Sequence, residues 1–277
     1  MAEPLLSLNA LGKRFGGVQA VKDLSFSVGE AEVVGLIGPN GSGKSTSVNL
    51  ISGTLPPTSG EIRFSGANVT SLSVMERVPL GLARTFQTTS VFAEFSVREQ
   101  VLTACHARYR SSASGSVFRT ASARREQSAQ RAKVEEILAF VGLANVADEL
   151  TSAISSAQQR LLMIATALAT EPRLVLLDEP AAGMVAKERK NLAMLIQRIR
   201  ERGTAVLVIE HDMRFIFNLC DRVACLVRGE VLVEGPGEVV QNDPRVIEAY
   251  IGSPQADPPP PSGTEPGPNP GEDTSNA

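Results

Sequence analysis

The sequence contains few of the residues that bind transition metals or form disulfide bonds. Among its 277 residues are three cysteines and only two histidines. An odd number of cysteines cannot all pair, and the spacing of Cys105, Cys220 and Cys225 is not that of a metal-ligand cluster. We therefore expect reduced thiols, as are usual in the cytosol, and no zinc site.

Long apolar runs are also absent. No uninterrupted stretch approaches the roughly 18 residues that a membrane-spanning helix needs. The N-terminal residues include Glu3 and Pro4 and lack the basic and then apolar pattern of a signal peptide. These absences predict a cytosolic protein that reaches a membrane only by docking onto a partner.

The C-terminal tail lacks basic residues and has little apolar surface. Of the 25 residues from 253 to 277, eight are proline, four are acidic and none is lysine or arginine. Such a composition cannot bury enough apolar area to order itself. We therefore predict one ordered domain over residues 1–252 and a disordered, proline-rich tail over residues 253–277.

The strong positive charge that is usual in nucleic-acid binders is missing as well. The formal net charge is −3, and it becomes +1 when the four acids of the tail are removed. Residues 109–130 are rich in serine, alanine and arginine but contain only Tyr109 and Phe118 as aromatics. A nucleic-acid patch and a solvated helix or loop surface are both possible there. The second interpretation is favoured, so nucleic acid is not an expected partner.

The most informative segment is the run Gly-Pro-Asn-Gly-Ser-Gly-Lys-Ser-Thr, which begins at Gly38 and ends at Thr46. This is the pattern of a phosphate-binding P-loop. The preceding run Ala31–Ile37 predicts a buried strand and the following Ser45–Ser52 a helix. Backbone N–H groups and the helix dipole would then point at an anion. The alternative is a glycine-rich turn that matches the pattern by chance.

Several residues of this loop have a predicted role toward a nucleotide. Glycine at positions 41 and 43 leaves the phosphates unobstructed. Lys44 adds a positive charge beside the β- and γ-phosphates, and the Ser45 hydroxyl can hold Mg²⁺. The nucleotide-binding residues predicted here are Gly38, Asn40, Gly41, Ser42, Gly43, Lys44, Ser45 and Thr46.

Two further apolar runs end in polar residues. Leu174–Leu177 is followed by Asp178 and Glu179, as expected of a buried parallel strand whose carboxyl end meets a ligand. Asp178 would meet the Mg²⁺ of the bound nucleotide, and Glu179 would take a proton from the attacking water. The alternative is a polar turn. Thr204–Ile209 is a similar strand, and it places His211 at the same, phosphate-facing side.

The remaining periodicity completes a fold prediction. Leu5–Val28 and Glu61–Phe64 have strand-like patterns and predict an antiparallel sheet beside the P-loop strand. Residues from about 90 to 165 look mainly helical. We therefore predict an α/β fold: a P-loop NTPase core with an antiparallel β flank and a mainly helical subdomain over residues 90–165 or so. Phe15 lies in the flank, where it either stacks on the adenine ring or belongs to the core.

These segments occur in an order that resembles the nucleotide-binding subunit of ATP-binding cassette (ABC) transporters, over residues 5–252. Gly38–Thr46 resembles the Walker A loop, Leu174–Glu179 resembles Walker B, and Ile209–Asp212 resembles the switch-histidine segment. Arg84-Thr85-Phe86-Gln87 resembles the Q-loop. The resemblance implies a catalytic group of Lys44, Gln87, Glu179 and His211, with Ser45, Gln87 and Asp178 as Mg²⁺ ligands. It also implies that Phe15 stacks on adenine and that Gln87 relays changes to the membrane subunit.

Other segments are similar to the branched-chain amino acid importer subgroup. They are Lys13–Gly17, Pro180–Met184, Ile209–Met213 and Asn242–Gly252. The resemblance implies an ATP-hydrolysing importer subunit for branched-chain amino acids or related small polar solutes, peripheral at the cytoplasmic face of the inner membrane. Its partners would be permease subunits, a second ABC ATPase and, indirectly, an extracytoplasmic solute-binding protein. Two alternatives are a soluble ABC ATPase acting on ribosomes or DNA and an ATP-binding regulatory subunit that does not hydrolyse.

Two departures from the family pattern lie on surfaces offered to a partner cassette. The signature motif, Leu-Ser-Gly-Gly-Gln in the family, is Ile154–Gln158 here, with Ala157 in place of glycine. Ser155 and Gln158 are the signature residues that the resemblance assigns to the partner's nucleotide. Val185 stands where the family usually has a polar D-loop residue. We therefore expect a heterodimer in which this chain's own Walker A site hydrolyses ATP and the partner's site, completed by this signature, is weak.

Overall fold

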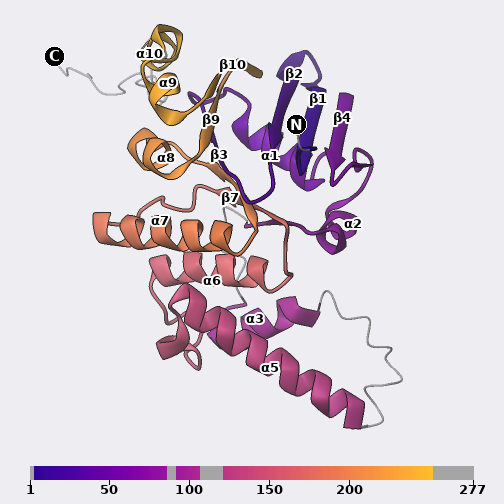
Figure 1. Cartoon of the computed structure of the whole chain (residues 1–277), viewed down its shortest axis with the longest axis vertical. Coiled ribbons are helices and arrows are strands. Elements are labelled where there is room, and N and C mark those ends of the chain that lie inside the picture. The colour runs from indigo at the N-terminus through magenta and orange to yellow at the C-terminus, as the bar shows by residue number, and fades with distance from the viewer. Residues whose placement is uncertain (1–2, 86–91, 107–120, 252–277) are drawn as a thin grey trace, which may run out of the picture.

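The computed structural model describes residues 3–85, 92–106 and 121–251. Within these ranges the strands form two sheets with helices packed around them (Figure 1). Gln87, the stretch 107–120 and the proline-rich tail lie outside the described residues.

A six-stranded sheet forms the centre of the molecule. Its strand order is β10-β9-β3-β8-β7-β6, with β9, β3, β8, β7 and β6 parallel and β10 antiparallel to β9. Because β3, β8 and β7 are neighbours, the segments that follow them leave the sheet at one edge. The strands are β3 (Val33–Ile37), β6 (Leu82–Arg84), β7 (Leu174–Asp178), β8 (Ala205–Ile209), β9 (Arg222–Val227) and β10 (Glu230–Gly235).

The central strands are buried on both faces, which explains why they are nearly all apolar. Every residue of β3, β7 and β8 is buried. Side chains alternate between the faces of a strand. Val33 and Ile37 accordingly belong to one hydrophobic core, together with the helices, whereas Val34 and Leu36 belong to a second core. The sheet is thus the middle layer of the molecule.

The second core is closed by a four-stranded antiparallel sheet, with order β2-β1-β4-β5. Its first hairpin pairs Leu6 with Val28 and Phe15 with Val18, on either side of a turn at Gly16 and Gly17. This sheet and helix α1 (Lys44–Ser52) lie together in the upper part of Figure 1. The strands are β1 (Leu6–Phe15), β2 (Val18–Val28), β4 (Ser59–Phe64) and β5 (Ala67–Asn68).

Helices gather at the opposite end of the molecule, where α3 and α5 form the bottom of Figure 1 beneath α6. The two sheets and these helices together confirm the predicted fold class, including the β flank and the helical subdomain. The domain boundaries themselves stay a prediction, and helix α6 extends beyond residue 165. The elements are α3 (Val97–His106), α5 (Ala121–Val141), η2 (Ala144–Val146) and α6 (Ser156–Leu168).

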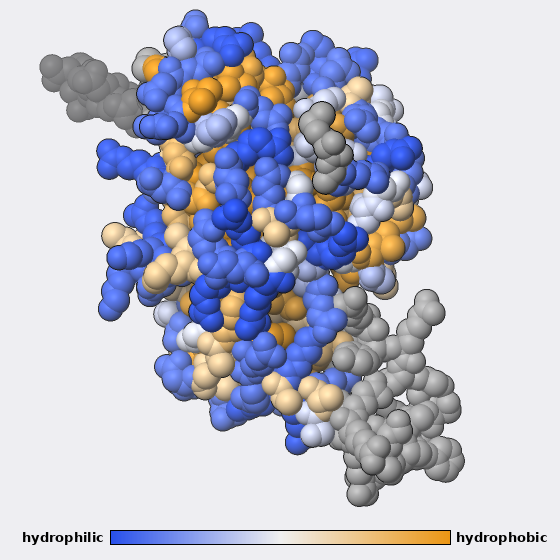
Figure 2. All heavy atoms as spheres, in the orientation of Figure 1, coloured by the Kyte–Doolittle hydropathy of each residue, from blue (hydrophilic) through white to orange (hydrophobic). Residues whose placement is uncertain are grey.

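The remaining helices cover the sheet and its edges. Among the described residues, no helix is both long enough and apolar enough to cross a bilayer. Hydrophilic residues cover most of the face in Figure 2, and apolar colour gathers at its top, in the region of α9 and α10. The helices are α2 (Val74–Arg77), η1 (Val78–Leu80), α7 (Ala186–Glu201), α8 (Met213–Leu219), α9 (Gly237–Gln241) and α10 (Pro244–Ile251).

The structure differs from the sequence-based expectation mainly at element ends. The strand predicted from Ala31 begins at Val33, because Ala31 has a φ of 49° and belongs to a turn. The helix predicted from Ser45 begins one residue earlier, at Lys44. The short strand Leu82–Arg84 was not predicted, since three residues are too few for a periodic pattern. This strand places Arg84 in the site.

Candidate functional site

A cavity of about 280 Å³ lies at the sheet edge where β3, β7 and β8 end. The structure brings together there most of the residues that were predicted from the P-loop and from the two polar strand ends. Ala20, from β2, also lines it and was not predicted. Gly38, Phe15, Asp178, Ser155 and Gln158 are not part of its lining. The lining residues are Ala20, Asn40, Gly41, Ser42, Gly43, Lys44, Ser45, Thr46, Glu179 and His211.

The loop at the floor of this cavity needs glycine at two positions. Gly38 has a φ of 152°, and a Cβ there would lie 2.1 Å from the carbonyl oxygen of Leu226. Gly43 has a φ of 104°, and a Cβ there would lie 2.5 Å from the carbonyl oxygen of Ala20. Any side chain at these positions would move the loop, so the glycines fix how closely it packs against β9 and β2.

Lys44 is the cation of the site. Its side chain is buried, with 6% exposure, and its Nζ donates to the carbonyl oxygens of Gly38 at 2.7 Å and Pro39 at 3.0 Å. Burial lowers the pKa of this ammonium, and the charges of Glu179 and Asp178 act in the opposite direction. The loop is therefore wrapped around a buried positive charge, as an anion site requires.

The hydroxyl of Ser42 supports the same interpretation. Its Oγ is buried and has no hydrogen-bond partner among the described residues. An unsatisfied buried hydroxyl is costly unless a ligand completes it. Because Ser42 lines the cavity, a phosphate oxygen is a fitting partner.

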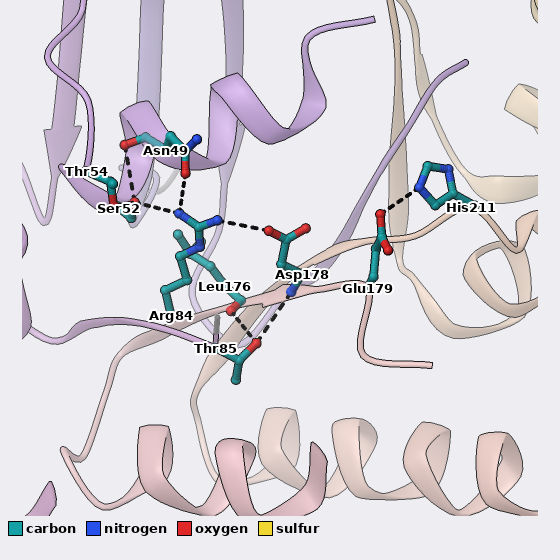
Figure 3. Close-up of polar contacts among 9 residues, drawn as sticks. All are labelled: Asn49, Ser52, Thr54, Arg84, Thr85, Leu176, Asp178, Glu179 and His211. Atoms are coloured by element: carbon teal, nitrogen blue, oxygen red, sulfur yellow. Dashed lines mark hydrogen bonds and ion pairs between the residues drawn. The ribbon is translucent and has the colours of Figure 1, made fainter. Parts of the chain in front are cut away.

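Two of the lining residues, Glu179 and His211, point toward each other (Figure 3). His211 Nε2 lies 2.7 Å from Glu179 Oε1, and the two side chains are 48% and 22% exposed, so water reaches both. The φ of Glu179 is 49°, a left-handed value that is uncommon outside glycine. Such strain at a polar strand end is typical of functional positions.

The Glu210 side chain links the segments that follow β7 and β8. Its carboxylate is buried and accepts hydrogen bonds from the backbone N–H of Ala181 at 2.6 Å and of His211 at 3.1 Å. Burial raises the pKa of this group. The sequence marked Glu210 only as part of the switch segment, and its contact with Ala181 requires the parallel pairing of β7 with β8.

Asp178 lies beside the cavity in a buried ion pair (Figure 3). Its Oδ2 accepts from Arg84 Nη2 at 2.9 Å, and the two side chains are 3% and 9% exposed. The other end of the guanidinium donates to Asn49 Oδ1 at 2.6 Å and to Ser52 Oγ at 3.2 Å, both on α1. Arg84 belongs to the segment that resembles the Q-loop, and its contact with Asp178 was not predicted.

The donors around this pair fit a divalent cation. Ser45 is exposed at the cavity, and the second carboxylate oxygen of Asp178 points away from Arg84, toward the side on which Glu179 lies (Figure 3). Hydroxyl and carboxylate oxygens are the ligands that Mg²⁺ prefers. The predicted third ligand, Gln87, lies outside the described residues.

Comparison with known proteins identifies the family of this chain. A family model described as "ABC transporter" matches residues 21–182, and one described as "Branched-chain amino acid ATP-binding cassette transporter" matches residues 230–256. The chain is 38% identical over 253 residues to the high-affinity branched-chain amino acid transport ATP-binding protein LivG of Salmonella typhimurium, covering 91% of this chain and 99% of that protein. The chain belongs to the ABC transporter family.

Other relatives agree with this assignment. BraF of Pseudomonas aeruginosa, also named as a high-affinity branched-chain amino acid transport ATP-binding protein, is 36% identical over 91% of this chain and 99% of its own length. The crystal structure of a nucleotide-free ATP-binding cassette from an ABC transporter has a TM-score of 0.79 and 30% identity, covering 91% of this chain and 100% of that one. The chain is therefore an ABC ATPase, and the alternative of a ribosome- or DNA-directed enzyme is not favoured.

By its resemblance to ABC cassettes, Phe15 is the residue expected to stack on the adenine ring. It ends β1 and is 47% exposed, so it is not a core residue. Lys13 Nζ lies 5.3 Å from its ring centroid. The ring is thus available to a ligand, and its role toward adenine stays a prediction.

We expect Phe15→Ala to weaken binding of ATP and ADP by about tenfold, because stacking of a base on an aromatic ring is worth about 1–3 kcal/mol. Fluorescence titration with a labelled nucleotide would measure this. Phe15→Tyr, which keeps the ring, is the control and should bind within about twofold of the original. Equal affinity of the Ala and Tyr variants would place adenine elsewhere.

The signature residues begin helix α6 and lie apart from the cavity. Ser155 is the N-cap: its Oγ accepts from the Gln158 backbone N–H at 3.3 Å, and Gln158 Oε1 accepts from the Ser155 N–H at 2.9 Å. Ala157 is helical, partly buried and without a positive φ. Alanine therefore imposes no backbone restriction there, and only the bulk of its methyl group separates it from the family's glycine.

Proposed function

We propose that the chain powers import of branched-chain amino acids or related small polar solutes. The observation that carries this proposal is the match of residues 230–256 to the branched-chain amino acid model, beyond the part shared by ABC cassettes in general. LivG and BraF, whose names state branched-chain amino acid transport, support it over nearly their whole lengths. The proposed location is the cytoplasmic face of the inner membrane, with the chain as a peripheral subunit.

Permease subunits are the proposed direct partners, and an apolar groove is the proposed contact. The groove, of about 310 Å³, lies between β6, α2, α3 and α6. Arg84 and Thr85 are part of its lining, and they begin the Q-loop segment whose Gln87 the ABC resemblance links to the membrane subunit. We propose that a helix of the permease inserts its apolar side there. The apolar lining residues include Val74, Val78, Leu82, Ala83, Ala104 and Met163.

In the proposed reaction, the Walker A loop binds the phosphates of ATP through its backbone N–H groups and Lys44. Ser45, Asp178 and Gln87 would hold Mg²⁺, which supplies charge neutralisation at the phosphate oxygens when bound. Glu179 orients water and accepts its proton, and His211, within hydrogen-bond reach of Glu179, holds the γ-phosphate in line. Reopening of the dimer resets the permease.

The second cassette of the dimer is proposed to be a different chain. Ala157 and Val185 both lie on surfaces that a partner's nucleotide and D-loop would meet, and Val185 is 62% exposed at the start of α7. The groups that handle this chain's own nucleotide are those of an active ABC enzyme. A heterodimer with one strong and one weak hydrolytic site accounts for both facts.

Purification of the tagged chain from membranes of its own cell, in mild detergent, tests the proposal. We expect multi-span permease subunits, a second cassette ATPase and an extracytoplasmic amino-acid-binding protein to accompany it. Ribosomal or DNA-repair proteins without a permease would overturn the importer proposal. A permease with a binding protein for another solute class would retain the importer and change its substrate.

A further inference from the structure

The backbone of Glu179 is held by hydrogen bonds from three parts of the chain. Its N–H donates to the carbonyl oxygen of Ile209 at 2.9 Å. Its own carbonyl oxygen accepts from Arg160 Nη1 at 2.8 Å and from the Ala182 N–H at 3.3 Å. Two of these partners come from the segments around the nucleotide. Arg160 alone among them comes from a helix outside those segments, α6.

The hydrogen bond from Arg160 to the Glu179 carbonyl oxygen can set the direction of the Glu179 carboxylate. Glu179 has the left-handed φ of 49°, so its side chain points where it does only while its peptide groups stay fixed. Arg160 is partly buried, and a charged guanidinium makes a stronger bond to a carbonyl than a neutral donor does. Loss of this donor would leave the longer Ala182 contact and allow the Glu179 peptide to turn.

Helix α6 connects this contact to the signature motif. Ser155 and Gln158 close its N-terminal turn, and Arg160 lies on the next turn of the same helix. An α-helix moves as a unit over such a distance, because each turn is bonded to the one before. Any displacement of Ser155 toward a partner's nucleotide is therefore carried to the guanidinium and on to the Glu179 carbonyl.

We infer that Arg160 is a positioning residue that couples engagement of the partner's nucleotide by Ser155 and Gln158 to the orientation of Glu179 in this chain's own site. This inference rests on the proposed dimeric ATPase. It gives the atypical signature a role even where its own hydrolytic site is weak: it reports that the partner's nucleotide is in place. Communication would then run through one side chain within a single subunit.

Arg160→Met tests the inference, because methionine keeps the length of the side chain and removes its donors. The matched control is Arg198→Met, which removes a guanidinium bond to the Phe140 carbonyl oxygen at 3.2 Å, between α7 and α5. In the purified complex we expect Arg160→Met to lower kcat by about 10- to 100-fold with KM within about twofold, since small misplacements of a reacting group have effects of this size. Arg160→Lys should recover part of the loss.

To measure the coupling, each variant is combined with a substitution of the Walker A lysine in the partner cassette, which removes ATP binding there. That partner change should slow hydrolysis at this chain's site in the original complex and have little further effect in Arg160→Met. If the two effects multiply independently, or if Arg160→Met matches Arg198→Met, the inference is wrong.

A readout on the isolated chain separates this outcome from failure of the proposed function. Backbone amide hydrogen exchange of the peptide containing Ala182 should become faster in Arg160→Met and stay unchanged in Arg198→Met. This measurement needs neither partner nor hydrolysis. Unchanged exchange would overturn the positioning role, whereas an original complex that binds but does not hydrolyse ATP would count against the proposed function alone.

Discussion

Replacing Glu179 with glutamine is expected to remove nearly all ATP hydrolysis by the assembled complex while leaving nucleotide binding intact. Glutamine has the same shape, so it can keep a hydrogen bond to His211, which lies 2.7 Å from the carboxylate. It cannot accept a proton from water, and general bases contribute about 10²- to 10⁴-fold to such reactions. A steady-state phosphate-release assay on the purified complex would measure the loss.

The size of the remaining activity also tests the proposed asymmetry. If both sites of the dimer hydrolysed ATP independently and equally, about half of the activity would remain after the loss of one general base. Unchanged hydrolysis would show that the site of this chain is not the strong one. Glu201→Gln, which removes an exposed acid at the end of α7, is the control and should leave the rate unaltered.

Arg84→Met is expected to destabilise the protein by about 3–5 kcal/mol, because it leaves the Asp178 carboxylate buried without its cationic partner. Both side chains are under 10% exposed, and the same guanidinium also bonds Asn49 and Ser52 on α1. Denaturant unfolding of the nucleotide-free chain would measure the change. The matched control is Arg63→Met, whose pair with Glu61 is solvent-exposed and should matter by less than about 1 kcal/mol.

A double variant distinguishes a buried charge from lost packing in this prediction. Arg84→Met combined with Asp178→Asn removes both charges and should recover a large part of the lost stability. Added Mg²⁺ should also stabilise Arg84→Met more than the original protein, since the cation can replace the missing positive charge beside Asp178. Equal unfolding midpoints for Arg84→Met and Arg63→Met would show that the ion pair is not a main support of the site.

Much of the candidate site could be predicted because its elements are local in sequence. A P-loop needs a strand, a glycine-rich turn and a helix in succession, and Val33–Ser52 supplies them within one short segment. The apolar runs that end at Asp178 and His211 likewise predict parallel strands whose carboxyl ends carry polar groups. Period and composition therefore sufficed to predict the lining residues of the cavity other than Ala20.

The partners of these residues depend on packing that the sequence does not display. Arg84 meets Asp178 across 94 positions, because β6 pairs in parallel with β7. Arg160 reaches the Glu179 carbonyl from a different helix. Every arginine in the chain is a candidate partner for a buried carboxylate until the strand order and helix faces are known.

The sequence by itself determined the fold class, the ABC family and the polar groups that we propose face the nucleotide, since these follow from short-range pattern. Only the tertiary structure decided how those groups are held: Asp178 by an ion pair, Glu179 by a strained backbone bonded to α6, and the strand ends by buried Glu210. The physical reason is that burial makes each polar group require a partner, and which partner it finds depends on the layers that surround it.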